Sequence, residues 1–163
     1  MTTSPGDAPR SLMDVVVAFL DERSWPYHRV DGRSVVTFPF GGDSEQWQVF
    51  VETKDRYDQV VVYSVCPFNI PVEERLAAAE YLTRANYGLI IGNFEMDMDD
   101  GEVRFKASID VEGSALDIAL VRQLVIANIR GMNQYVAGLG AIVEGGRTPK
   151  ELAADAEGRG AGS

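Results

Sequence analysis

Apolar residues recur at intervals of three and four in three stretches of the chain, which is the spacing of a helix with one buried face. The first stretch opens at Ser11, where Asp14 completes a start like a capping box, and it stops at Trp25-Pro26. The second runs from about residue 72 to 86, and the third from about residue 114 to 143. We therefore expect three helices, the last of them long.

Apolar and polar residues alternate in the segments between these helices, as they do in strands. Asp31-Gly32 stands between residues 27–30 and 33–40 and predicts a hairpin with a type I′ turn. Two more strands are expected at residues 46–53 and 59–66, and the second is apolar on both faces, which is typical of a central strand. The order α-β-β-β-β-α-β-β-α predicts an α+β fold, with a mainly antiparallel sheet packed by helices on one face.

The stretch NFEMDMDDGEVRFKASIDVEG, which begins at position 93, predicts a further hairpin. A turn at Asp100-Gly101 pairs Asp97 with Arg104 and Glu95 with Lys106, and it leaves the other face apolar. A shift of the register by one residue would destroy both patterns. We therefore interpret this acidic stretch as the tip of a hairpin.

Other chemical interpretations of the sequence find little support. An EF-hand calcium loop over the acidic turn would need ligands where Met96 and Ala107 stand. Acid-base catalysis would need two carboxylates that converge on a pocket, whereas carboxylates at a hairpin tip stay hydrated. With one histidine and one cysteine, a structural zinc site is not expected. A nucleophilic dyad of Cys66 and His28 remains a formal alternative, although nothing near either residue supports it. We expect no enzyme, no cofactor and no metal site.

Length and charge narrow the function further. The 163 residues predict a single domain over residues 11–145, a disordered N-terminus at 1–10 and a flexible C-terminal tail at 146–163. Against 25 acidic residues the chain has 15 basic ones, a net charge of −10, which argues against nucleic acid as a partner. No segment predicts a signal peptide or a membrane span, and the lone cysteine fits a reducing compartment. We expect a cytoplasmic protein without a membrane partner.

The long helix carries an apolar arc wider than one contact with a sheet requires. Deep burial within the monomer would explain the arc, and so would a two-fold contact with a second subunit. Of the two, we favour the dimer. Ile126 falls among the polar positions of this helix and is expected to be exposed.

Residues 82–146 resemble the YbjN family of bacterial proteins. The resemblance rests on RAN at 84–86, on IIGNFEMDMDDGEVRFKASIDVEG at 90–113 and on the apolar helix that follows. It implies a fold similar to that of type III secretion chaperones, an α+β sandwich that is often dimeric, binds proteins and catalyses nothing. The family is described as sensory transduction regulators. It has no settled catalytic residues, so none are carried over.

From the residues and the resemblance together, we expect a homodimeric protein-binding regulator or chaperone-like adaptor. Trp47, Phe50 and Ile126 are the candidate contact residues for a protein client. Alternation along a strand and the phase of a helix place Phe50 and Ile126 opposite the core. The alternative is a small-molecule-sensing regulatory domain with a pocket between the sheet and the long helix.

Overall fold

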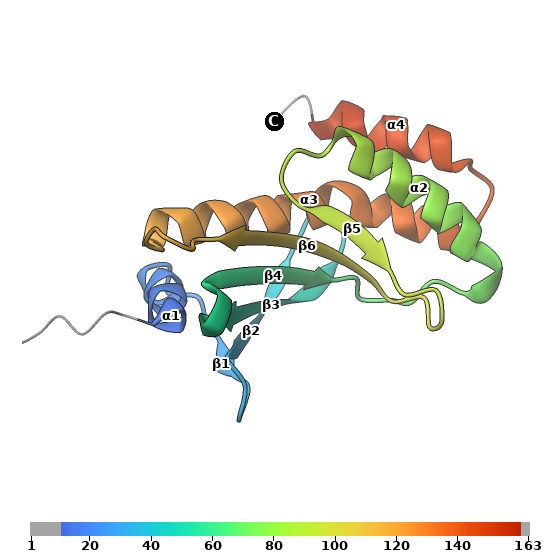
Figure 1. The fold of residues 1–163 in the computed structure, drawn as a ribbon. Helices are drawn as coiled ribbons and strands as arrows, with labels where there is room; N and C mark the ends of the chain where they lie inside the picture. The colour runs from blue at the N-terminus through green and yellow to red at the C-terminus, as the bar shows by residue number, and fades with distance from the viewer. Residues whose placement is uncertain (1–10, 161–163) are drawn as a thin grey trace, which may run out of the picture.

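One antiparallel sheet and a layer of helices make up the fold, which the computed structural model describes for residues 11–160 (Figure 1). The expected order of elements is confirmed, and one more helix follows the long one. The disordered N-terminus expected at residues 1–10 lies outside the described residues. In chain order the elements are α1 (Leu12–Glu22), β1 (His28–Arg29), β2 (Val35–Gly41), β3 (Gln46–Lys54), the 3₁₀ helix η1 (Asp55–Tyr57), β4 (Gln59–Val65), the 3₁₀ helix η2 (Val72–Glu74), α2 (Arg75–Gly88), β5 (Asn93–Met96), β6 (Val103–Asp110), α3 (Ile118–Glu144) and α4 (Pro149–Gly160).

The strands form one sheet in the order β1-β2-β3-β4-β6-β5, and every neighbouring pair is antiparallel. β4, the strand that is apolar on both faces, lies inside the sheet between β3 and β6, as its sequence predicts. Along β3, the side chains of Trp47, Val49 and Val51 are buried, while Gln46 and Gln48 are exposed. One face of the sheet therefore belongs to the core.

The helices lie on this core face (Figure 1). α3 packs across β4 and β6, α1 packs beside α3 and against β3, α2 packs on β5, and α4 packs on α2 and α3. The start predicted for α1 is confirmed: the Ser11 hydroxyl accepts from the backbone N–H of Asp14, and the Asp14 carboxylate accepts from that of Ser11. In the part of the chain that the structure describes, no helix packs on the opposite face of the sheet.

Neighbours within the same chain account for the wide apolar arc of α3. The helix begins at Ile118 rather than near residue 114, because Asp117 caps it by accepting a hydrogen bond of 2.8 Å from the N–H of Leu120. It contacts the sheet on one side and α1, α2 and α4 on others. Deep burial within the monomer thus explains the arc, and α3 offers no separate argument for a dimer.

Within the C-terminal segment expected to be flexible, residues 149–160 form the helix α4. Thr148 and Glu151 form a capping box, with hydrogen bonds of 3.3 Å from the N–H of Glu151 to the threonine hydroxyl and 3.0 Å from the N–H of Thr148 to the carboxylate. The apolar side chains of α4 then bury against α2 and α3. These buried residues are Leu152, Ala153 and Ala156.

Both predicted hairpins form, but their turns differ from the predicted ones. In the first, the N–H of Val30 donates to the carbonyl of Val35, so the loop is longer than two residues. A type I′ turn needs positive φ at both central residues, and only Gly32 has it, at 70°.

In the second hairpin the register is shifted by two residues from the predicted one. Glu95 stands opposite Arg104, and the N–H of Asp97 donates to the carbonyl of Glu102. A shift of two preserves which side chains share a face, so the apolar face and the charged face both survive. The longer turn forms because Gly101 takes a φ of 81° and bonds to Ile70, with its carbonyl 2.8 Å from the N–H of that residue.

Candidate partner-binding surface

The three predicted contact residues do not lie on one surface. Trp47 is buried, only 3% exposed, and its indole Nε1 donates a hydrogen bond of 3.0 Å to the hydroxyl of Ser64, so it has no surface to offer a partner. Phe50 lies on the opposite face of the sheet and is half-buried. Ile126 is also half-buried and belongs to α3, on the helix side. The structure therefore separates Phe50 from the other two.

Phe50 belongs to an apolar strip on the face of the sheet that lacks helices. Thr37 and Tyr63 stand directly opposite Phe50 on the neighbouring strands. Val35 on β2 and Val65 on β4 point to the same face. We call Val35, Phe50, Tyr63 and Val65 the open sheet face. Sequence analysis identified Phe50 alone, although the alternation along β4 also assigns Tyr63 and Val65 to this side.

A hollow of about 230 Å³ lies over the open sheet face. Val30 and Arg33, from the loop between β1 and β2, line it together with Glu52 and Arg104. Glu52 forms an ion pair of 3.5 Å with Lys54. The side chain of Arg33, in contrast, has no hydrogen bond, ion pair or ring contact within residues 11–160. This corner of the molecule thus combines an apolar floor with an unpaired guanidinium, on a chain that is otherwise strongly acidic.

Arg104 forms the opposite wall of the hollow and is held in place from two sides. Its guanidinium lies 4.6 Å from the centre of the Tyr63 ring, a cation–π contact, and it pairs with the carboxylate of Glu95. Lys106 donates to the other carboxylate oxygen of Glu95 at 2.8 Å. Partial burial opposes ionisation of Glu95, but the hydrogen bonds from Lys106 and Arg104 outweigh it and lower the pKa of this carboxyl. The carboxylate therefore stays charged and fixes both cations.

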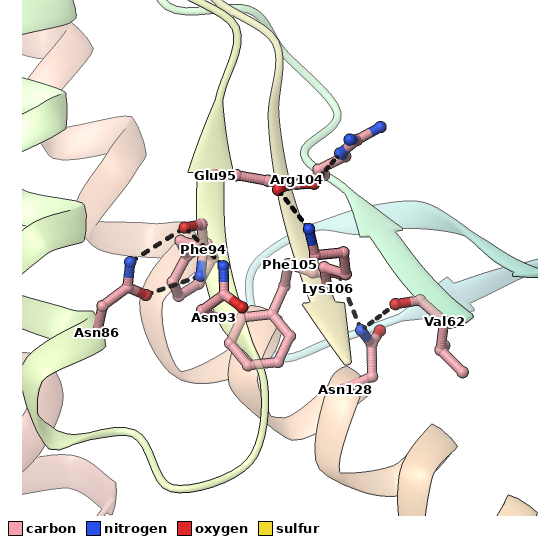
Figure 2. Close-up of polar contacts among 9 residues, drawn as sticks. All are labelled: Val62, Asn86, Asn93, Phe94, Glu95, Arg104, Phe105, Lys106 and Asn128. Carbon is pink, nitrogen blue, oxygen red and sulfur yellow. Dashed lines mark hydrogen bonds and ion pairs between the residues drawn. The ribbon is translucent and has the colours of Figure 1, made fainter. Parts of the chain in front are cut away.

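The outer edge of β5 is closed by a side chain from α2 (Figure 2). The amide of Asn86 accepts a hydrogen bond of 2.7 Å from the N–H of Phe94 and donates one of 3.0 Å to the carbonyl of the same residue. It thereby supplies the two bonds that another strand would make. Gly92 leaves room for the Phe105 ring, which a Cβ would approach to 2.5 Å, and Phe94 packs edge-on against this ring at 4.8 Å. The residues that carry the family resemblance are thus structural.

The acidic turn uses its carboxylates to bind its own backbone. The side chain of Asp97 accepts from the N–H of Asp99, and that of Asp100 accepts from the N–H of Glu102, each at 2.8 Å. Within residues 11–160, no group of three or more His, Cys, Asp or Glu side chains is arranged to hold a metal ion. The turn is a structural feature of the hairpin.

The hypothesis of a Cys66–His28 dyad is contradicted by the sheet order. β1 carries His28, Cys66 follows β4, and two strands lie between them, so three strand spacings put the residues at least about 14 Å apart. His28 is exposed, whereas Cys66 is buried, and burial raises the pKa of its thiol to about 11. The thiol is therefore protonated at neutral pH and has no base beside it.

The alternative of a small-molecule sensor places its pocket between the sheet and α3, where the side chain of Asn128 lies. Asn128 of α3 is fully buried and donates hydrogen bonds of 2.9 Å to the carbonyls of both Val62 and Phe105. Its own oxygen accepts a bond of 2.6 Å from Ser64, which in turn accepts from Trp47. This chain of bonds fixes α3 on β4 and β6 (Figure 2) and leaves no room for a ligand at that point.

The structure is thus a single antiparallel sheet with helices on one face and an apolar strip on the other, which defines its class as α+β. Residues 13–138 match the model of the YbjN family, described as "Putative bacterial sensory transduction regulator". The chain belongs to the YbjN family. No curated protein matches it. Among helices of residues 11–160, none has the length and apolarity to cross a membrane.

Solved structures show the same fold at low identity. The crystal structure of YbjN, "a putative transcription regulator from E. coli", is similar with a TM-score of 0.56 and 13% identity, over 77% of this chain and 91% of that one. A chain of the HopA1-SchA chaperone-effector complex has a TM-score of 0.46 and 15% identity, over 80% of this chain and 91% of its own. The first likeness supports the α+β fold, and the second is too distant to carry an argument.

Proposed function

We propose that this protein is a non-enzymatic regulator of the cytoplasm that binds another protein on its open sheet face. The observation that carries the proposal is the apolar strip around Phe50 and Tyr63, which no helix of residues 11–160 covers. Apolar surface left uncovered on one side of a sheet marks a site of interaction more often than an accident of folding. The reducing compartment is supported by the single, buried thiol.

The chemistry around the strip favours a particular kind of partner. The hollow takes a bulky apolar side chain onto Phe50, and the free guanidinium of Arg33 at its rim takes a carboxylate. An extended segment in which an aromatic or aliphatic residue is followed by Asp or Glu combines both features. Because the chain has a net charge of −10, this local cation is a specific point of attraction that fixes where the acidic residue of such a segment binds.

The experiment compares capture by the wild-type chain with capture by Phe50→Glu and by Tyr57→Glu. Phe50→Glu introduces a carboxylate at a half-buried aromatic residue of the strip and Tyr57→Glu at an exposed one, and Tyr57 lies away from the hollow, in η1. A bacterial protein captured by the wild type and by Tyr57→Glu, but not by Phe50→Glu, should then bind in calorimetry with an affinity that Arg33→Ala also weakens. Binding that survives both Phe50→Glu and Arg33→Ala would overturn the proposal.

The homodimer half of the expectation needs another surface, because α3 is covered within its own chain. Ile126, half-buried on the helix side, stays a candidate contact only if a partner approaches from that side.

A further inference from the structure

A polar hollow of about 620 Å³ lies where the loop between β2 and β3 meets α3 and the last turn of α4. The polar side chains that line it are those of Asp43, Ser44, Arg130, Asn133, Gln134 and Arg159. We call these six residues the arginine hollow. Its volume falls in the range of pockets that hold small molecules. It belongs to the helix layer and lies apart from the open sheet face, which is on the other side of the sheet (Figure 1).

Hydrogen bonds join the three walls of the arginine hollow. The side chain of Asn133 accepts from the backbone N–H of Asp43 and donates to the Oδ2 oxygen of its carboxylate, each at 2.8 Å. Gly42 allows this approach of the loop to α3, because a Cβ there would overlap with the Asn133 side chain. On the other side, the amide nitrogen of Gln134 donates a bond of 3.2 Å to the carbonyl of Ala156 in α4. The hollow is therefore preformed.

Two guanidiniums line the arginine hollow, and neither is paired. In the part of the chain that the structure describes, Arg130 and Arg159 form no hydrogen bond and no ion pair. The last turn of α4 suits Arg159 because of the helix dipole, but Arg130 lies inside α3, where no such effect applies. One unpaired arginine on a helix, such as Arg122, is ordinary. Two on one hollow, with Asp43 as the one carboxylate of the lining, leave a local positive charge on a chain of net charge −10.

The other groups of the lining add donors to the two cations. A guanidinium donates from a planar fork that matches two oxygens of a phosphate group. The hydroxyl of Ser44 makes no hydrogen bond to any residue from 11 to 160, and Gln134 uses one of its two amide N–H groups, so both side chains have a donor left. Two forks and two further donors around one hollow suit an anion with several oxygens.

Asp43 indicates what this phosphate is attached to. Its Oδ2 oxygen accepts from Asn133, whereas its Oδ1 oxygen accepts no hydrogen bond within the described residues. A carboxylate repels a phosphate beside it but accepts readily from a hydroxyl group. A ligand that carries hydroxyl groups next to its phosphate therefore matches the hollow better than inorganic phosphate does, and sugar phosphates have both groups.

We infer that the arginine hollow binds a sugar phosphate, with the phosphate on Arg130 and Arg159 and a sugar hydroxyl on Asp43. Nucleic acid and an anionic bilayer would bring many phosphates against an acidic surface, whereas a single phosphate ester meets only the local charge of the hollow. The inference is independent of the proposed function, because the partner surface around Phe50 lies on the other face of the sheet.

Isothermal titration calorimetry with inorganic phosphate, ribose 5-phosphate and glucose 6-phosphate tests the site. At least one of the sugar phosphates should bind about 5-fold or more tightly than inorganic phosphate. Arg130→Gln and Arg159→Gln should each weaken that binding about 10-fold or more, because each removes a charged hydrogen-bond donor. Arg122→Gln is the matched control, since it removes an unpaired arginine of α3 outside the hollow, and it should change the affinity less than about 2-fold. Far-UV circular dichroism checks that the variants fold, which the exposure of all three arginines leads us to expect.

Asp43→Asn separates the sugar from the phosphate. Asparagine keeps an oxygen for the bond from Asn133 but removes the negative charge, so inorganic phosphate should bind more tightly while the advantage of the sugar phosphate shrinks.

No heat from any of the three ligands at about 10 mM would overturn the inference. Binding that survives Arg130→Gln and Arg159→Gln combined, or that Arg122→Gln weakens as much as they do, would also overturn it. O-phosphoserine that binds more tightly than both sugar phosphates would point to a phosphorylated protein segment and refute the sugar.

Discussion

Replacing Asn86 by alanine should release the outer edge of β5 from α2. The amide of Asn86 makes two hydrogen bonds to the backbone of Phe94, and both are partly buried. A net hydrogen bond contributes about 0.5–1.5 kcal/mol, so losing both should lower the free energy of unfolding by about 1–3 kcal/mol. For a chain of this length, a loss of about 2 kcal/mol lowers the melting temperature by about 4–8 °C.

Urea unfolding of the wild type, Asn86→Ala and Asn93→Ala measures this loss. Asn93 is the matched control, because it is exposed on β5 next to Phe94 and its amide makes a single long hydrogen bond of 3.3 Å to the same Phe94 carbonyl. Asn93→Ala should therefore cost less than about 1 kcal/mol. Hydrogen exchange gives a second readout, because the Phe94 amide should lose protection in Asn86→Ala while amides in the interior strand β4 keep theirs.

The reasoning fails if Asn86→Ala and Asn93→Ala destabilise the protein equally. It fails also if the Phe94 amide exchanges at the wild-type rate in Asn86→Ala, since the amide of Asn86 would then not be what protects this edge.

Three further outcomes follow from local geometry. Gly101→Ala should lower the free energy of unfolding in urea by at least about 3 kcal/mol, because φ is positive and a Cβ would lie 2.1 Å from the carbonyl oxygen of Ile70. Gly113→Ala, where φ is also positive but the space is open, should lower it by only about 1 kcal/mol, and equal losses would contradict this reasoning. Leu152→Ala should cost about 2–4 kcal/mol if α4 is part of the core, whereas no change would return the segment to a loose tail. Iodoacetamide at pH 8 should alkylate native Cys66 about 100-fold more slowly than the unfolded chain, since a pKa raised from 9.0 to about 11 leaves about one thiol in a thousand ionised, and equal alkylation rates would refute the burial argument. Because the pKa of this thiol is higher in the folded chain, its contribution to stability is complete below pH 9 and is lost as pH rises toward 11.

The order of elements could be predicted because each one has a strong local signal. Ser11 and Asp14 mark the start of α1, and the two-sided apolar run of β4 marks an interior strand. The capping box at Thr148 and Glu151 was equally present, but the small residues after it do not form the wide apolar stripe that usually indicates packing. Apart from Leu152, the buried side chains of α4 are the alanines 153 and 156, and such short side chains give a weak hydrophobic signal in the sequence.

The register of the second hairpin shows a limit of local pairing rules. Alternation determines which face each side chain occupies, and it is unchanged by a shift of two residues. The shift is decided elsewhere, by the bond between Gly101 and Ile70, and Ile70 lies outside the hairpin. With that contact in place, Glu95 meets Arg104 directly and Lys106 diagonally, so one carboxylate holds both cations.

The candidate contact residues do not share one surface, because sequence gives the phase of an element but not its neighbours. Phe50 lies on the face of β3 opposite the core, as its alternation predicts, whereas Trp47 was also named as a contact residue and lies in the core, hydrogen-bonded to Ser64. Ile126 was taken as exposed because the helical phase places it among polar positions, whereas helix packing leaves it half-buried. Which face of a sheet stays uncovered depends on all the helices together.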